Sequence, residues 1–358
     1  MAVTLDESIN RQTHGVIGQL LARQTFWVFV TAVLAFVYLS YASGAFFTGQ
    51  NLFNVARNCA FVGIIGLGMT AVIATGGIDL SVGSILALTG MVCGMMMSWN
   101  YPIWQAVPCA FVAALAVGFA NGFFIAYVGM PPFVVTLGMM SVARSLAMVL
   151  SGNQMVYHFG IDHPKLVALG GGSTSGWFRA LAGLAGVDTG LGVFFLNLAD
   201  RINIPYPALL LAVFALMFGF AFRWLVWGRY IFAIGGNEQA ATLTGVPVRR
   251  IKISVYMISA LMAGIAGILQ VGWLGTITTG MGAGIELYAI AAVVVGGANL
   301  TGGSGTAFGA VVGAVLFEMI RNSLTLLGIN PFWQGTFIGS FIILAVLFDR
   351  VRALRQAD

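Results

Sequence analysis

The stretch VIATGGIDLSVGSILALTG, residues 72–90, decides how this chain folds. Apolar residues on both sides are typical of segments that cross a lipid bilayer, yet the middle contains Gly76, Gly77, Gly83 and the charged residue Asp79. Free backbone groups and a charge are costly at membrane depth unless protein or a water-filled cavity surrounds them. The stretch therefore predicts a helix that breaks inside a membrane-embedded bundle.

The composition of the whole chain supports this interpretation. Hydrophobic residues make up 59% of the 358 positions and charged residues only 8%, whereas globular domains carry about 25% charged residues. A helix needs about 20 apolar residues to cross a bilayer. We find ten candidate spans, near residues 25–43, 58–75, 82–99, 103–127, 133–150, 205–227, 253–273, 286–298, 305–326 and 332–349. Apolar and polar residues do not alternate, which disfavours a β-barrel. We predict an all-α fold, a polytopic membrane helical bundle of about ten transmembrane helices with glycine-rich breaks.

The basic residues predict which loops face the cytoplasm. Ten of the sixteen lie in the terminal segments and around the loop 228–252, on one side of the predicted spans. By the positive-inside rule this side is cytoplasmic, so both termini are expected there, over 1–24 and 351–358. The region 25–350 is then a single transmembrane domain, and its longest break, 151–204, faces outward as a docking surface or a cap. Because the basic residues form no separate soluble patch, we do not expect nucleic-acid binding.

A second glycine-rich stretch, GGANLTGGS at 296–304, repeats GGIDLSVGS at 76–84, with Asn299 opposite Asp79. Paired glycine interruptions in two halves of a chain are typical of transporter helices that break beside the pathway. The candidate residues for such breaks are Gly76, Gly77, Asp79, Ser81, Gly296, Gly297 and Asn299. The alternative for Asp79 is a helix cap, in which its carboxylate accepts a hydrogen bond from the amide of Ser81 or Val82.

Three further charged residues lie within predicted spans. Glu318 and Arg321 are three positions apart, on one face of a helix, and can neutralise each other. Arg144 has no nearby partner in the sequence, so we expect a structural ion pair or triad with Glu318, and contact with substrate is the alternative.

Gly305, Gly309 and Gly313 follow the second break at intervals of four residues. They form one flat helix face that permits close helix approach, either within the chain or at a subunit seam.

The sequence contains no recognisable catalytic or metal-binding motif. Neither lysine, Lys165 or Lys252, follows a G-x-x-x-x-G pattern, so the chain is not expected to hydrolyse ATP unaided. No histidine lies in a predicted span, and H-E-x-x-H is absent. We therefore expect no catalytic residue, no metal site and no cofactor in this chain.

The polar loop GRYIFAIGGNEQAATLTGVPVRRIKI, residues 228–253, contains a short amphipathic pattern. NEQAATLTG predicts a short helix closed by Gly245, with Leu243 and the alanines on one face. The loop is either a basic cytoplasmic loop or a helix that fits a groove in a soluble partner.

Four motifs, in this order and at this spacing, resemble the permease subunits of bacterial ABC importers of the ribose, xylose and arabinose type. They are IATGGIDLSVGSILALTG, PPFVVTLGMMSVARSLAMVL, WGRYIFAIGGNEQAATLTGV and ELYAIAAVVVGGANLTGGSGT, within a resemblance that covers about residues 50–350. The resemblance implies a multi-pass permease of the bacterial inner membrane, working as a dimer, here expected to be a homodimer. It also implies that a periplasmic sugar-binding protein delivers a monosaccharide or related polyol, and that a separate cytoplasmic ATPase binds ATP and Mg²⁺.

The resemblance further implies that the loop 228–252 couples to the ATPase. The family's E-A-A pattern followed by glycine corresponds to Gln239, Ala240, Ala241 and Gly245, with a glutamate one position early, at 238. The implied coupling residues are Glu238, Gln239, Ala240, Ala241, Leu243 and Gly245. Asp79 would then stabilise a helix break beside the cavity.

Two other classes of protein are weighed against this interpretation. A self-sufficient ion-coupled transporter or channel would use Asp79, Glu286 or Glu318 to bind protons or sodium ions, but it would leave the docking loop unexplained. An intramembrane enzyme would need a nucleophile and base, or metal ligands, within the spans. The sequence leaves the substrate open among pentoses, hexoses and cyclic polyols. Aromatic residues near the pathway, namely Phe133, Trp273, Tyr288 and Phe308, are candidates for stacking on a sugar face.

Overall fold

The computed structural model describes residues 24–330, 333–336, 339–340 and 343, which form helices joined by turns. Seven of the described helices are long and apolar enough to cross a membrane. They are α3 (Gln24–Ala42), α4 (Gly49–Ala74), α6 (Ile103–Phe123) with its π-helical extension η1 (Phe124–Val128), α7 (Pro132–Ser151), α11 (Tyr206–Trp224), α14 (Val248–Leu274) and α16 (Ala307–Leu326).

Two shorter apolar helices complete the described membrane bundle, α5 (Val82–Ser98) and α15 (Ile285–Val295). Together with the seven longer helices they correspond to the first nine predicted spans. The tenth predicted span, near 332–349, lies mostly outside the described residues, and the predicted terminal segments lie almost wholly outside them. The two short helices are the ones that adjoin the glycine-rich breaks, so the predicted interruption of the helices is confirmed.

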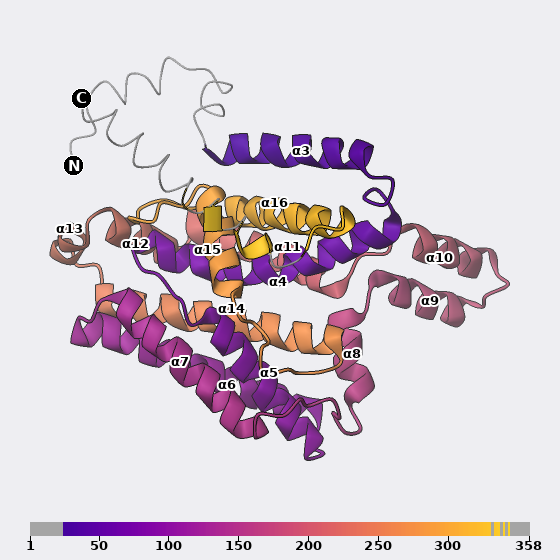
Figure 1. Cartoon of the computed structure of the whole chain (residues 1–358), viewed down its shortest axis with the longest axis horizontal. Coiled ribbons are helices and arrows are strands. Elements are labelled where there is room, and N and C mark those ends of the chain that lie inside the picture. The colour runs from indigo at the N-terminus through magenta and orange to yellow at the C-terminus, as the bar shows by residue number, and fades with distance from the viewer. Residues whose placement is uncertain (1–23, 331–332, 337–338, 341–342, 344–358) are drawn as a thin grey trace.

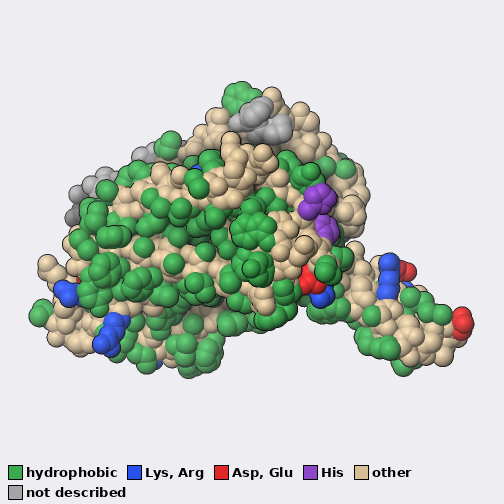
Figure 2. Space-filling view, turned by 90° about the horizontal axis from the view of Figure 1, so that it is seen from below, with side chains coloured by type: hydrophobic (Ala, Val, Ile, Leu, Met, Phe, Trp, Pro, Cys, Tyr) green, Lys and Arg blue, Asp and Glu red, His purple; other side chains and the backbone are tan. Residues whose placement is uncertain are grey.

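The helices α3, α4, α14 and α16 run along the long axis of the molecule, between two ends that differ in structure (Figure 1). At one end lie α12 (Val226–Gly236) and α13 (Glu238–Leu243), and we name it the α13 end. At the other lie α8 (His163–Gly171), α9 (Thr174–Ala185) and α10 (Gly190–Arg201), and we name it the α8 end. Figure 2 shows hydrophobic side chains over the middle of one face, with charged side chains gathered at both ends.

The centre of the bundle is α14, which packs against α4, α5 and α6. Small residues permit this close packing. A Cβ at Gly118 of α6 would lie 2.7 Å from the carbonyl oxygen of Tyr256, and a Cβ at Gly267 of α14 would lie 2.5 Å from that of Leu86. Without side chains at such positions the backbones approach closely, which is the common mode of helix association in membranes.

The glycine face of α16 packs within the chain. A Cβ at Gly313 would collide with the carbonyl oxygen of Ala292 in α15, and one at Gly309 would collide with that of Gly296. Of the two alternatives open to this pattern, the described residues therefore show intramolecular packing.

The predicted outward segment 151–204 is largely helical. α8 packs against α14, and a bridge between Val156 and Ile277 ties the preceding turn to the bundle. α9 and α10 pack on each other and project beyond the bundle at the α8 end (Figures 1 and 2). Thr174 fixes their base, because its hydroxyl donates to the carbonyl of Ile202 at 2.8 Å and accepts from the amide of Ile204 at 3.0 Å.

Candidate functional site

The two glycine-rich breaks meet at the α13 end of the bundle. The amide of Gly303, in the second break, donates to the carbonyl of Ala74, where α4 ends, at 3.0 Å. Gly302 approaches the first break so closely that its Cβ would lie 2.9 Å from the amide nitrogen of Gly76. Gly76 and Gly297 both have positive φ, +77° and +102°, a conformation that favours glycine. The repeat seen in the sequence is thus a contact in space.

Asp79 and Asn299 form the same turn in the two breaks. Asp79 Oδ1 accepts from the amide of Ser81 at 3.0 Å and from its hydroxyl at 2.5 Å. Asn299 Oδ1 accepts from the amide of Thr301 at 3.0 Å and from its hydroxyl at 2.8 Å. Such local bonds from Asp and Asn side chains stabilise turns. The hydrogen bond predicted from Ser81 to Asp79 is present, so Asp79 organises the turn that leads into α5.

Asp79 also joins a buried polar cluster. Its Oδ2 accepts from the hydroxyl of Ser259 in α14 at 2.9 Å, while Asn121 of α6 donates to the Ser81 hydroxyl at 2.9 Å. The Tyr256 hydroxyl lies beside Gly77, where a Cβ would stand 2.5 Å from it. In the part of the chain that the structure describes, no basic side chain forms an ion pair with Asp79. This environment ties the first break to α6 and α14, and its place on a pathway stays a prediction.

The ion pair predicted between Glu318 and Arg321 is present. The guanidinium donates to both carboxylate oxygens at 2.9 Å, and Glu318 is only 4% exposed.

The pairing predicted between Arg144 and Glu318 is wrong. The Arg144 guanidinium donates instead to the carbonyls of Met281, at 2.5 Å, and Thr279, at 3.4 Å. The physical reason is the position of α7, which packs against α5 and faces the irregular segment before α15. The carboxylate that interacts electrostatically with Arg144 is that of Glu286.

The predicted coupling helix is α13, at the extreme of the molecule. Asn237 caps it by accepting from the amide of Ala240 at 3.0 Å, and Gly245, with φ +83°, follows its end. Glu238 forms an ion pair of 2.7 Å with Lys252, so α13 is tied to the first turns of α14. The predicted short helix before Gly245 is therefore confirmed in structure.

The side chains of α13 divide into an exposed and a buried set. Gln239, Ala240 and Leu243 are exposed, and Leu243 is 89% so. Ala241 is 5% exposed and packs into the bundle, so it does not share the exposed face of Leu243 as predicted, and its role in coupling to the ATPase stays a prediction. One face of α13 is therefore buried and the other exposed. Ala241 anchors the helix to the bundle, and Leu243 faces solvent.

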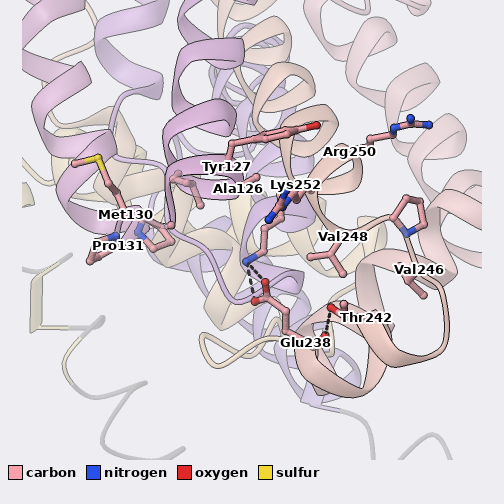
Figure 3. Close-up of a pocket in the computed structure, with 15 residues that line it drawn as sticks. Ala126, Tyr127, Met130, Pro131, Glu238, Thr242, Val246, Val248, Arg250 and Lys252 are labelled. Carbon is pink, nitrogen blue, oxygen red and sulfur yellow. Dashed lines mark hydrogen bonds and ion pairs between the residues drawn. The ribbon is translucent and has the colours of Figure 1, made fainter.

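A cavity of about 920 Å³ lies beside α13, between Glu238 and Thr242 on one side and the turn 125–132 on the other (Figure 3). Basic side chains line its wall, and the Arg249 guanidinium stands 5.3 Å from the centre of the Tyr127 ring. This segment comprises the end of the π-helical η1 and the turn after it, where the chain reverses at Gly129, with φ +78°. This wall is not among the predicted site residues, although GMPP between two spans is a turn signal.

Comparison with known proteins gives one family and several close relatives. The family described as "Branched-chain amino acid transport system / permease component" matches residues 51–346. The ribose import permease protein RbsC of Escherichia coli (strain K12) is 36% identical over 311 residues, 87% of this chain and 89% of the relative.

Two other relatives match over a similar length. The L-arabinose ABC transporter permease protein AraH of Azospirillum brasilense is 33% identical, over 95% of this chain and 91% of the relative. The D-allose transport system permease protein AlsC of Escherichia coli (strain K12) is 31% identical, over 90% of each. No solved structure gives a significant match.

Proposed function

The chain belongs to the permease component family of transport systems, and from this premise we propose that it is the membrane-spanning subunit of an ATP-binding-cassette importer for a monosaccharide or related polyol. The observation that carries the proposal is the agreement among its relatives. Three relatives are named as permeases for the sugars ribose, L-arabinose and D-allose. Their identities to this chain are between 31% and 36%, over at least 87% of its length. That agreement favours a sugar over the branched-chain amino acids in the family's description.

The α13 end is proposed to face the cytoplasm. Five basic residues lie within α12 or on either side of α12 and α13, and such an excess is typical of cytoplasmic loops; they are Arg223, Arg229, Arg249, Arg250 and Lys252. α3 begins near the same end, since the Thr25 hydroxyl donates to the carbonyl of Gly296 at 3.0 Å. Both termini are proposed to be cytoplasmic, in the bacterial inner membrane. The projecting α8 end would then face a periplasmic sugar-binding protein.

The exposed side of α13 is proposed to dock a separate ATPase, which binds ATP and Mg²⁺ and performs the hydrolysis. A second copy of this chain would complete the pathway as a homodimer. Leu243 has no role in the fold that would explain an apolar side chain at 89% exposure, and a partner's groove would bury it.

The structure suggests how movement of α13 would reach the breaks. α12 leads directly into α13, and a Cβ at Gly235 of α12 would collide with the carbonyl of Ala74 and the amide of Gly303. These two groups belong to the first and second break. Rotation of α12 and α13 by the ATPase would therefore act on both breaks at once, while the Glu238–Lys252 pair carries the movement into α14.

Uptake by the reconstituted chain tests this function. Proteoliposomes containing the chain with its ATPase and binding protein would be offered radiolabelled D-ribose, L-arabinose and D-allose, with L-leucine for comparison. We expect sugar uptake only when ATP and all three proteins are present. The matched control is an ATPase that cannot hydrolyse ATP. Uptake of L-leucine in place of sugars would contradict the substrate class, and gradient-driven uptake by this chain alone would contradict the importer.

A further inference from the structure

A second cavity, of about 260 Å³, lies between α4, α14, α15 and α16. It is in the half of the bundle nearer the α8 end, because Trp273 is next to the last residue of α14 and its backbone approaches Gly171 of α8. The lining residues on which the argument depends are Asn58, Gln270, Trp273, Tyr288, Glu318 and Arg321. This volume is slightly below the range of roughly 300–1,000 Å³ for pockets that hold drug-sized ligands, so only a small ligand fits.

Aromatic side chains form part of the wall, with Trp273 held in a fixed orientation. The guanidinium of Arg57 stands 4.3 Å from the centre of its ring, and the Phe61 ring lies 5.8 Å away at an angle of 31°. Tyr288 lines the same cavity, whereas Phe133 and Phe308 are exposed elsewhere. Rigid aromatic rings offer apolar faces for the C–H groups of a ligand and polar tips for its hydroxyls.

The polar side chains leave hydrogen-bond acceptors free. Asn58 Oδ1 and Gln270 Oε1 are buried atoms without a hydrogen-bond partner among the described residues. A buried acceptor without a donor costs stability. Ligand hydroxyls that donate to these two oxygens would relieve that cost.

The charges in the cavity are already matched. Both oxygens of Glu318 accept from Arg321, so the carboxylate is not free to bind an ammonium group. The same two hydrogen bonds occupy part of the Arg321 guanidinium. A zwitterionic amino acid would have to break this pair, whereas a neutral polyol would not. A ligand rich in hydroxyls and without net charge therefore fits the wall best.

We propose that this cavity is a binding site for a neutral monosaccharide within the permease chain itself, with Gln270 accepting from a sugar hydroxyl and Trp273 stacking on a sugar face. The proposal rests on the proposed function and deepens it. On the proposed topology the cavity lies on the side where a binding protein would release its sugar. It is separate from the helix breaks, whose polar cluster is built from Asp79, Asn121 and Ser259.

Equilibrium binding to the full chain in lipid nanodiscs tests the site. The probes are radiolabelled D-ribose, L-arabinose and D-allose, with L-leucine for comparison. We expect saturable binding of at least one sugar and none of L-leucine. Gln270→Leu and Trp273→Leu are each expected to weaken sugar binding by about tenfold or more. Trp273→Phe keeps an aromatic face and is expected to retain most of the affinity.

The matched controls are Gln105→Leu and Trp104→Leu, at the start of α6. They remove the same types of side chain outside the cavity, and Trp104 is 69% exposed. We expect both to bind sugar as the wild type does. Thermal unfolding of every variant identifies those that fail to fold. If Trp273→Leu fails to fold, the test compares Trp273→Phe, which is expected to bind, with Gln270→Leu, which is expected to bind weakly.

Three results would overturn the proposal. Absence of saturable sugar binding, unchanged binding by both cavity variants, or preferential binding of L-leucine would each do so. The uptake assay distinguishes failure of the proposed binding site from failure of the proposed function. ATP-dependent sugar uptake without binding in this cavity would overturn the site and leave the proposed function standing, whereas absence of sugar uptake would overturn the proposed function and the site with it.

Discussion

Asp79 and Asn299 make the same two hydrogen bonds at the two helix breaks, each accepting from the amide and the hydroxyl of the residue two positions later. Their surroundings differ, because Asp79 is fully buried and Asn299 is exposed. The turn can therefore form with a neutral amide, as it does at Asn299. What the carboxylate adds at Asp79 is its bond to Ser259 in α14.

We predict that Asp79→Asn folds but transports poorly. The amide oxygen keeps the two hydrogen bonds of the turn. The amide nitrogen replaces the oxygen that accepts from Ser259 and cannot accept, so the hydrogen bond between the first break and α14 is lost or reversed. Asp79→Ala removes all three bonds and is expected to lower the free energy of unfolding by about 1–3 kcal/mol. The measurements are expression, thermal unfolding and ATP-dependent uptake per inserted chain.

Asn299→Ala serves as the control for these variants. The exposed turn can exchange its bonds for bonds to water, so we expect a smaller loss of stability than for Asp79→Ala. Wild-type uptake by Asp79→Asn would leave Asp79 with a role in the turn alone.

A second prediction concerns the buried pair of Glu318 and Arg321. Glu318→Gln keeps one acceptor oxygen for the partly buried guanidinium but removes its charged partner and turns the second acceptor into a donor, so it is expected to destabilise the chain by about 1–3 kcal/mol. Glu318→Gln combined with Arg321→Gln is expected to cost less than the sum of the single changes. The measurement is a double-mutant cycle of unfolding free energies.

Arg144→Gln provides the comparison cycle. Because Arg144 binds backbone carbonyls elsewhere, its effect is expected to add to that of Glu318→Gln within about 0.5 kcal/mol. A coupling between Arg144 and Glu318 as large as that between Glu318 and Arg321 would contradict the arrangement of the structure.

The helices of the fold could be predicted from the sequence more fully than the contacts between side chains could. Nine spans follow from apolar runs of sufficient length, and the Asp79 turn follows from a local side-chain preference. The partners of Arg144 left no signal, because the carbonyls of Thr279 and Met281 are backbone groups in an irregular segment. The two free amide oxygens of the smaller cavity also left no signal, since Asn58 and Gln270 line one cavity only when α4 packs against α14.

A third prediction concerns the exposed side of α13. Leu243→Glu removes an apolar contact for the ATPase and places a charge there, so co-purification of the ATPase is expected to fall sharply while thermal unfolding stays unchanged. Leu184→Glu is the matched control, because Leu184 is 87% exposed on α9 at the opposite end. Retained ATPase association by Leu243→Glu would exclude this side of α13 as the docking surface.

Ala241→Glu is expected to act differently. Ala241 is on the buried side of α13, so a charged side chain there would lower the unfolding temperature as well as ATPase association. An Ala241→Glu chain of normal stability would show that α13 is not anchored through this residue.

A fourth prediction concerns the contact between α15 and α16. A methyl group at Gly313 would collide with the carbonyl of Ala292, so Gly313→Ala is expected to destabilise the chain by about 1–3 kcal/mol. Gly219 in α11 has no atom within 4 Å of a Cβ, so Gly219→Ala is expected to be neutral or to stabilise its helix by up to about 1 kcal/mol. Thermal unfolding in the same detergent compares the two variants, and equal effects would contradict the close packing at Gly313.

The last prediction concerns acid pH at the α8 end, where Asp162 joins two helices. Its Oδ1 pairs with Lys165 of α8 at 2.7 Å, and its Oδ2 accepts from the amide of Ile103, at the start of α6, at 3.0 Å. The hydrogen bond from Lys165, followed by that from Ile103, holds the pKa of the Asp162 carboxyl below its usual range.

Because the pKa of Asp162 is lower in the folded chain than in the unfolded one, its stabilising effect is complete above the unfolded value of about 3.9. The effect is lost as the pH falls through the lower folded value. We therefore expect the start of α6 to lose protection from hydrogen exchange below about pH 4, and Asp162→Asn to weaken this dependence, because the amide still accepts from Ile103 but does not titrate. Asp200→Asn, an exposed change in the same segment, is the control and should follow the wild type at each pH. If Asp162→Asn lost hydrogen-exchange protection at acid pH as much as the wild type does, a titrating group other than Asp162 would be responsible.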